Sequence, residues 1–306
     1  MADSGADTGA ATNVFADGGA GGSVAPDGPC DDGLTAFGDA AAFARAIGVC
    51  KGLVSATFAN GADGQHGVLP SFGKKIVALE GKNLGVLSTG WARAYDSIDP
   101  GSTASFKSGV QMGNGLPVAG AVPAGYPKSV GGCAVSDQIF DPMRLSLVLE
   151  VPADARGFAL DFDFFSGEWP DYVCTKYNDG FLVLVNDQPI TFLGVNDAFF
   201  DRCTAATQTG CRGDPPIFAT SKCGGDLGEL EETGFYATDL YCNGQLSTGG
   251  GATGWLTTQA PAQPGAQLRV DLLIWDSGDA RFDSSVLMDH FRWVTNDIAP
   301  STTRLR

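Results

Sequence analysis

Positive charge is scarce in this sequence, and histidine is scarcer. The 306 residues include 19 Lys and Arg against 35 Asp and Glu, which gives a formal net charge of −16, and there are only two histidines. A chain this acidic repels DNA, RNA and anionic lipid, so we expect no nucleic-acid partner. The same charge suits a solvated extracellular surface or the binding of divalent cations.

Long apolar runs are also missing. No stretch reaches the roughly 18 apolar residues that a membrane-spanning helix needs, so we expect no transmembrane segment. The first ten residues, MADSGADTGA, have neither the basic nor the apolar region of a secretory signal peptide. Because the cysteines argue for export, we expect that a signal sequence has been removed.

Several catalytic motifs are absent. The sequence has no Gly-x-Ser-x-Gly nucleophile elbow and no glycine-rich phosphate loop with its lysine. Its two histidines, His66 and His290, lie in a glycine-rich stretch and in an apolar run, where a structural role is the commoner one. We therefore predict no catalytic residues and no enzymatic activity.

The cysteines are even in number and none forms a CxxC pair. They are Cys30, Cys50, Cys133, Cys174, Cys203, Cys211, Cys223 and Cys242. With two histidines, the chain has few ligands for structural zinc, so disulfides in an oxidising compartment are the better interpretation. The pairings Cys203–Cys211 and Cys223–Cys242 would close local loops, and unpaired buried thiols remain the alternative.

Composition divides the chain into a tail, a folded domain and a short end. Residues 1–33 are rich in Ala, Gly and Asp and cannot bury enough apolar surface to fold, so we predict a disordered tail. A single domain over residues 34–297 follows, and then a C-terminal tail over 298–306. Residues 39–50, DAAAFARAIGVC, predict the one helix, capped by Asp39.

Strand patterns dominate the rest of the domain. Apolar residues alternate over 144–151, 158–164 and 268–274, and residues 180–185 are apolar on both faces, as in a central strand. Shorter runs at 76–79 and 84–87 and a last run at 285–294 complete the set. We predict an all-β fold, a jelly-roll-like antiparallel β-sandwich. Residues from about 195 to 265, rich in Cys and Gly, predict a disulfide-stapled insertion or a set of short edge strands.

Two groups of oxygen-bearing side chains lie at predicted strand ends. The candidate metal ligands are Glu168, Asn178 and Asp179 in the first group and Asp276, Asp279 and Asp283 in the second. Carboxylate and amide oxygens suit a hard cation, so we predict calcium (Ca2+), although the spacing is not that of an EF-hand. The alternative is that Asp and Gly are simply good turn residues.

Aromatic residues surround the first group. Trp169, Tyr172 and Tyr177 are candidates for ligand contact, because exposed rings stack on sugars, and core packing is the alternative. Asp161, Asp163 and Glu168 raise the further alternative of a carbohydrate-active hydrolase. However, Glu168 follows a glycine that changes its side of the strand, so the geometry of an acid and a nucleophile is not secured.

The central motif resembles the bacterial choice-of-anchor L domain family. The resemblance covers most of residues 40–294 and is carried by Phe162, Phe164, Ser166, Glu168, Trp169, Pro170, Asp171, Tyr172, Asn178, Asp179 and Phe181, with weaker support from Leu87–Gly90, Asp283–Val286, Asp289 and the helix that ends in Cys50. It implies an exported surface protein, anchored in one of several ways and without established enzymatic activity. The tail is similar to the spacers of myxobacterial surface lipoproteins, although we expect no C-terminal anchor after the last strand.

The sequence thus predicts an extracellular, cell-surface binding or adhesive module, stabilised by disulfides and calcium. Its partner would be a surface glycan, a protein or a second copy of the chain. A structural subunit of a surface fibre or coat is the alternative function, because a free strand edge could pair with a neighbour.

Overall fold

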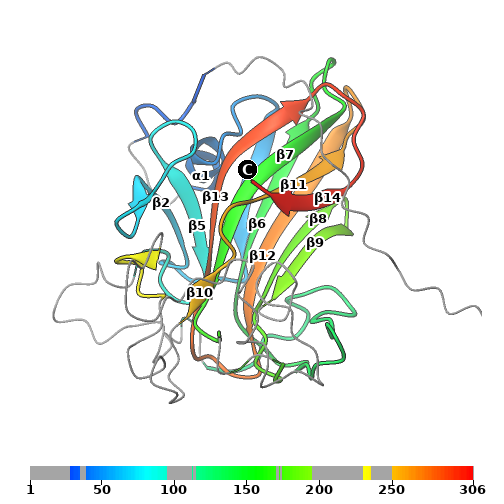
Figure 1. Ribbon diagram of the computed structural model, residues 1–306. Coiled ribbons are helices and arrows are strands. Elements are labelled where there is room, and N and C mark those ends of the chain that lie inside the picture. The colour runs from blue at the N-terminus through cyan, green and yellow to red at the C-terminus, as the bar shows by residue number, and fades with distance from the viewer. Residues whose placement is uncertain are drawn as a thin grey trace, which may run out of the picture.

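Alternating apolar residues build two antiparallel sheets that pack face to face (Figure 1). The computed structural model describes residues 28–34, 39–94, 112, 115–169, 172, 174–194, 230–235 and 250–305. The predicted all-β sandwich with one short helix is confirmed. No helix among these residues is long and apolar enough to cross a membrane.

Five strands form the first sheet and seven form the second. The first has the order β1 (Leu53–Ala59), β6 (Ile139–Glu150), β12 (Gln267–Ser277), β8 (Gly180–Val185) and β9 (Gln188–Gly194). The second runs β14 (Ser301–Arg304), β11 (Leu256–Pro261), β7 (Gly157–Ser166), β13 (Ser284–Val294), β5 (Leu84–Ser88) and β2 (His66–Leu69), with β10 (Gly251–Ala252) also paired to β7. A small hairpin joins β3 (Ser71–Phe72) to β4 (Ile76–Val77).

The main core lies between the two sheets. It takes every second residue of the long strands, including Leu145 and Leu147 of β6 and Phe162 and Phe164 of β7. Because side chains alternate across a strand, the intervening residues point to the outer faces. This two-residue period also fixes which way each acidic side chain at the strand ends points.

Helix α1 (Ala40–Ala46) packs against β1 and β5, strands of different sheets. The carboxylate of Asp39 accepts a hydrogen bond from the N–H of Ala41 (2.7 Å), as expected for an N-cap. Phe43 and Ile47 enter the core beside Gly85, where an added Cβ would lie within 2.6 Å of both side chains. Glycine at this position therefore allows the helix to approach the sheet closely.

Two predicted boundaries are wrong, and one open alternative is decided in part. Within the segment predicted as an insertion or as short edge strands, β10 and β11 are strands that pair with β7. Residues 28–33 are not all tail, because Cys30 is disulfide-bonded and Asp31 is buried. Residues 301–304 form β14, which pairs with β11.

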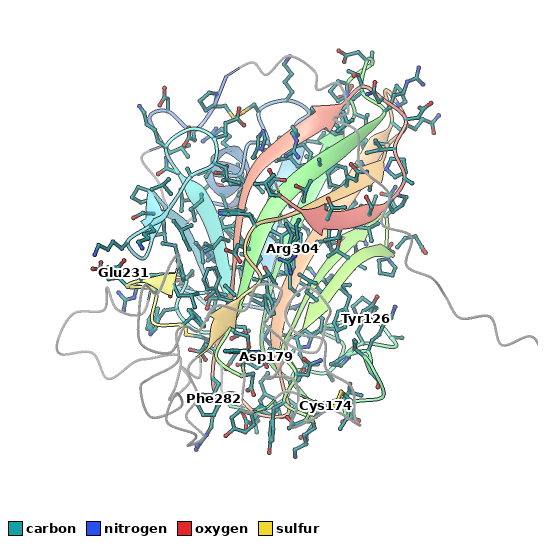
Figure 2. The ribbon with its side chains drawn as sticks, viewed as in Figure 1. Tyr126, Cys174, Asp179, Glu231, Phe282 and Arg304 are labelled. Carbon is teal, nitrogen blue, oxygen red and sulfur yellow. A yellow bond between two sulfur atoms is a disulfide. The ribbon has the colours of Figure 1, made fainter. Side chains whose placement is uncertain are left out.

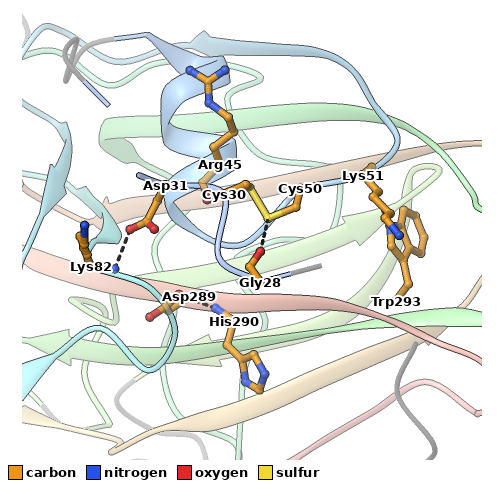
Figure 3. Close-up of a disulfide and its surroundings, with 10 residues drawn as sticks. All are labelled: Gly28, Cys30, Asp31, Arg45, Cys50, Lys51, Lys82, Asp289, His290 and Trp293. Carbon is orange, nitrogen blue, oxygen red and sulfur yellow. Dashed lines mark hydrogen bonds between the residues drawn. A yellow bond between two sulfur atoms is a disulfide. The ribbon is translucent and has the colours of Figure 1, made fainter. Parts of the chain in front are cut away.

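A disulfide and a buried carboxylate fasten the start of the folded chain (Figure 3). Cys30 is bonded to Cys50, just past the helix, and Cys133 is bonded to Cys174. The carboxylate of Asp31 accepts hydrogen bonds from the backbone N–H groups of Lys82 and Asn83, both at 2.7 Å. The other four cysteines, and with them the predicted pairs Cys203–Cys211 and Cys223–Cys242, lie outside the described residues.

Replacing Cys30 and Cys50 together by serine should destabilise the protein. The bridge spans 20 residues, and closing a loop of about that size is worth about 3 kcal/mol of unfolding free energy. Urea unfolding followed by tryptophan fluorescence measures the loss. An unchanged midpoint and slope would show that Asp31 and the helix contacts hold this segment without the disulfide.

Candidate functional site

The core between the sheets becomes acidic at one end. Asp276 lies two residues beyond Ile274 on the inward face of β12, and Asp179 lies two residues before Phe181 of β8. The alternation that places the apolar residues in the core therefore points both carboxylates between the sheets. Both side chains are fully buried. Figure 2 shows Asp179 toward this end of the sandwich, with Phe282 and Cys174 beyond it.

Asp179 is held by hydrogen bonds from two strands. Its carboxylate accepts one from the N–H of Ser277 (3.1 Å) and one from the hydroxyl of Ser284 (2.7 Å), so it links β12 of one sheet to β13 of the other. In contrast, neither carboxylate oxygen of Asp276 receives a hydrogen bond of normal geometry. The nearby hydroxyl of Thr89 lowers the pKa of Asp276, and a contact with the Asp276 carboxyl lowers that of Asp179.

Glu168 and Asp283 complete the buried set, and Asp279 lies at its rim. Glu168 is 1% exposed, and its Oε2 atom has no hydrogen-bond partner. Asp283 is fully buried directly before β13. Asp279 is only partly buried and lies near the positive charges of Arg281 and Lys176.

Carboxyl groups from the two predicted sets of ligands lie close enough for their charges to interact. Burial raises the pKa values of the Glu168, Asp179 and Asp276 carboxyls well above their usual range. Neighbouring charges add to this effect: Asp179 raises the pKa of Glu168 and of Asp276. Residues from both groups therefore share a single acidic region, the acidic end.

Asp141 of β6 belongs to the acidic end, although sequence reasoning missed it. Its side chain is 7% exposed, its backbone has φ +41°, and its charge raises the pKa of Asp276. The signal in the sequence was a lone aspartate within the apolar stretch IFDPM. Its position depends on the irregular pairing of β6 with β12 near Asp276, which the sequence does not reveal.

The sequence predicts Asn178 as a metal ligand and Trp169 as a ligand-contact residue. Asn178 is fully buried directly before Asp179, its amide lies beside Gly194 of β9, and neither amide atom has a hydrogen-bond partner among the described residues. Trp169 is 3% exposed and packs in the main core, so its prediction as a ligand-contact residue is wrong. Burial of so large an apolar ring is favourable, and this outweighed its place in a polar loop.

Tyr172 and Tyr177 are half-buried and form an aromatic cluster with Phe282. The ring of Tyr172 lies 5.6 Å from that of Tyr177 and 5.2 Å from that of Phe282. All three residues come from the loops that carry the acidic end, and Lys176 lies over the ring of Tyr177 at 4.9 Å. Unlike Trp169, these rings keep a surface that a ligand could contact.

Asp161 and Asp163 lie on the opposite face of β7 from the core. Asp161 accepts hydrogen bonds from the Thr257 hydroxyl (2.6 Å) and from Arg292 Nη1 (2.9 Å), and it also contacts His290 Nδ1 (2.8 Å). Asp163 accepts a hydrogen bond from the Thr253 hydroxyl. Since Glu168 is part of the acidic end between the sheets, the three carboxylates of the hydrolase alternative do not face one cleft.

The donor set fits a hard cation. Carboxylate oxygens are the ligands that calcium prefers, and both oxygens of Asp276 and one of Glu168 are buried without hydrogen-bond partners. Among the described residues, no three Asp, Glu, His or Cys side chains already converge as a metal cage. Coordination would therefore require side-chain rotation toward a common point.

The metal-free protein should become more stable as the pH falls from 8 to 5. Burial raises the pKa values of Glu168, Asp179, Asp276 and Asp279, and that of Asp289 to about 6, so the folded state binds more protons than the unfolded state. This stability is complete below the unfolded pKa and is lost as the pH rises through the folded pKa.

Thermal melting in metal-depleted buffer measures this trend. The variant Asp276→Asn, which removes one buried charge, should melt higher than the wild type at pH 8 and show a shallower pH dependence. A wild-type midpoint that falls steadily with acidification would contradict the assignment.

Comparisons with known proteins add little to this picture. No family model matches the chain, and no curated protein matches it in sequence. Among solved structures, the chain is similar to TmCBM61 in complex with beta-1,4-galactotriose, at 8% sequence identity and a TM-score of 0.27, over 83% of this chain and 91% of that chain. At this TM-score the two backbones differ too much for the likeness to bear on the ligand or on the role of any residue.

Proposed function

We propose that the protein is an exported, non-catalytic binding module whose β-sandwich is stabilised by calcium at the acidic end. The observation that carries this proposal is the burial of Glu168, Asp179 and Asp276 without an ion pair to any described Lys or Arg. An uncompensated buried carboxylate costs several kcal/mol, so protons or a cation must offset the charge. At neutral pH, calcium does so without requiring protonation.

The disulfides support export. Both Cys30–Cys50 and Cys133–Cys174 join segments distant in sequence, and such bridges persist in oxidising compartments. The motif resemblance to the choice-of-anchor L family, carried by Glu168, Asp179 and their neighbours, points the same way. Extracellular calcium sites bind at about 0.1–1 mM, which matches a site without a preformed cage.

The proposed ligand surface is the aromatic cluster over the acidic end. Tyr172, Tyr177 and Phe282 keep partly exposed rings, which suit stacking on a sugar or packing against a protein partner. The absence of catalysis is part of the proposal. It is supported by Asp161, whose carboxylate accepts hydrogen bonds from Thr257 and Arg292 of its own sheet.

Calcium should raise the melting temperature of the metal-depleted protein. At 100 times the dissociation constant, a ligand that binds only the folded state adds about 2.7 kcal/mol, or roughly 5–10 °C for a domain of this size. The variant Asp179→Asn should lose most of this shift. Asp154→Asn, an exposed aspartate between β6 and β7, at the opposite end of the strands, should keep it. A midpoint that does not respond to millimolar calcium would overturn the metal proposal.

Binding to a glycan array, with calcium and then with chelator, tests the ligand surface. We expect binding that requires calcium and that falls at least tenfold in Tyr172→Ala, with the calcium-dependent melting shift retained. Binding that is equal with and without Tyr172 would exclude the aromatic cluster as the contact surface.

One observation favours the second candidate, a structural subunit. Strand β1, LVSATFA, pairs with β6 on one side and with no described strand on the other, and it carries no charge or proline that would block pairing. Val54 on this strand is 52% exposed.

If β1 drives assembly, sedimentation should show concentration-dependent oligomers that Thr57→Lys disrupts. A lysine on the edge strand discourages strand pairing between molecules. A strict monomer at high concentration would leave the binding module as the function.

A further inference from the structure

A β-bulge in β13 turns His290 toward the outer face of the second sheet. The pairing of β13 with β7 shifts register between Asp289 and Arg292, and His290 has a φ of +53°. Two hydrogen bonds fix this irregular backbone. The N–H of His290 donates to the Asp289 carboxylate (2.6 Å), and the N–H of Phe291 donates to the carbonyl of Ile47 at the end of α1 (2.7 Å). Since a positive φ is unfavourable for a residue other than glycine, the fold gives up stability to place this side chain.

Asp161 holds the side chains of His290 and Arg292 from beneath. It is 0% exposed, and its Oδ2 atom is 2.8 Å from Nδ1 of His290 and 2.9 Å from Nη1 of Arg292. Because a carboxylate oxygen only accepts hydrogen bonds, Nδ1 carries the proton, and Nε2 of the neutral ring is an acceptor. The two donor nitrogens lie 3.1 Å apart because they share this oxygen.

The outward atoms of both side chains are open. The side chain of His290 is 38% exposed and that of Arg292 is 26% exposed. Nη1 of Arg292 also donates to the carbonyl of His290 (2.9 Å), so the guanidinium is fixed by this one nitrogen. Nε and Nη2 of Arg292 and Nε2 of His290 have no hydrogen-bond partner among the residues that the structure describes. The pair therefore presents donors and an acceptor side by side.

The outer face of the first sheet shows what charge compensation alone requires. Asp271 of β12 is 1% exposed and is bonded to an arginine, Arg269 (2.9 Å), and to a serine hydroxyl. Asp161 likewise has an arginine and a threonine hydroxyl as partners. His290 and its bulge are thus not needed to compensate Asp161, which leaves contact with a ligand as their role.

An aromatic ring lies on the same face of the sheet. Trp255 is half-buried and packs against the apolar cluster outside the second sheet, which includes Phe165 of β7. It precedes Thr257, the residue paired with Asp161, by two positions, or about 7 Å along β11. His290 is on β13, two strands and about 10 Å across the sheet from β11 (Figure 1). This spacing of a ring and hydrogen-bonding groups matches a short oligosaccharide.

Charge determines the class of ligand. The net charge of −16 and the carboxylate of Asp161 repel an anion, and the exposed guanidinium of Arg292 repels a cation. A sugar hydroxyl both donates and accepts, and Trp and Arg are residue types that often dominate binding. We infer that this outer face of β7 binds a neutral saccharide without a metal, through Trp255, His290 and Arg292. This surface goes beyond the proposed function, because it lies on the other face of β7 from the core and does not include the acidic end.

Glycan binding in the presence of chelator tests the inference. The full chain should bind neutral oligosaccharides on an array in EDTA, and calorimetry with the best of them gives the dissociation constant. Trp255→Ala removes the ring, Arg292→Lys keeps the charge without the open guanidinium edge, and His290→Asn keeps a residue that tolerates a positive φ. Each should weaken binding about tenfold or more, as expected of a residue that dominates an interface. Arg269→Lys, in the corresponding pair on the first sheet, is the matched control and should bind like the wild type.

The outcomes separate this surface from the calcium-dependent one. Tyr172→Ala should leave the binding in chelator unchanged. Loss of all binding in chelator overturns the inference and leaves the calcium module intact. Equal binding by the wild type and the three variants, or binding to acidic glycans alone, also overturns it. Should Trp255→Ala fail to fold, as judged by circular dichroism, Arg292→Lys and His290→Asn still decide.

Discussion

Burial of several carboxylates between the two sheets is the constraint on which the rest of the acidic end depends. The period of the strands leaves no choice of direction: a residue two positions beyond Ile274 must point inward, and in this chain it is Asp276. Asp179 satisfies its oxygens with Ser277 and Ser284 and so joins the sheets, whereas Asp276 has no comparable donor. A core that ends in this way needs protons or a cation to offset the buried charge.

The local sequence pattern predicts the helix and the long strands. Their places in the two sheets depend on pairing between segments distant in the chain. The helix capped by Asp39 and the long strands follow from periodicity, and so does the opposite orientation of Asp161 and the phenylalanines beside it. The sequence also supplies the two acidic groups. Their meeting depends on β12 lying between β6 and β8, a pairing of segments at least 85 residues apart in the chain that no local pattern encodes. Asp141 was missed for the same reason, because it enters through an irregular pairing in that sheet.

The outer face of β7 shows how the same residue types serve another role. Asp161 is as buried as Asp276, yet Arg292 and the Thr257 hydroxyl supply its hydrogen bonds, so its charge is compensated within the sheet. Likewise, the carboxylate of Asp289 accepts backbone N–H groups of Leu79 and Glu80 and fastens that segment to β13. Asp161 and Asp289 thus belong to the scaffold, whereas Asp276 has no such donors at the acidic end.

The disulfide Cys133–Cys174 links these two roles. Cys174 lies in the loop that carries Glu168 at one side and Asp179 at the other, and its partner lies in the segment before β6. Because the bridge limits how far this loop can move, less conformational entropy is lost when the carboxylates rotate onto an ion. In the proposed calcium site, the covalent frame of Cys133–Cys174 would raise the affinity through this preorganisation, and the carboxylates would determine which ion is bound.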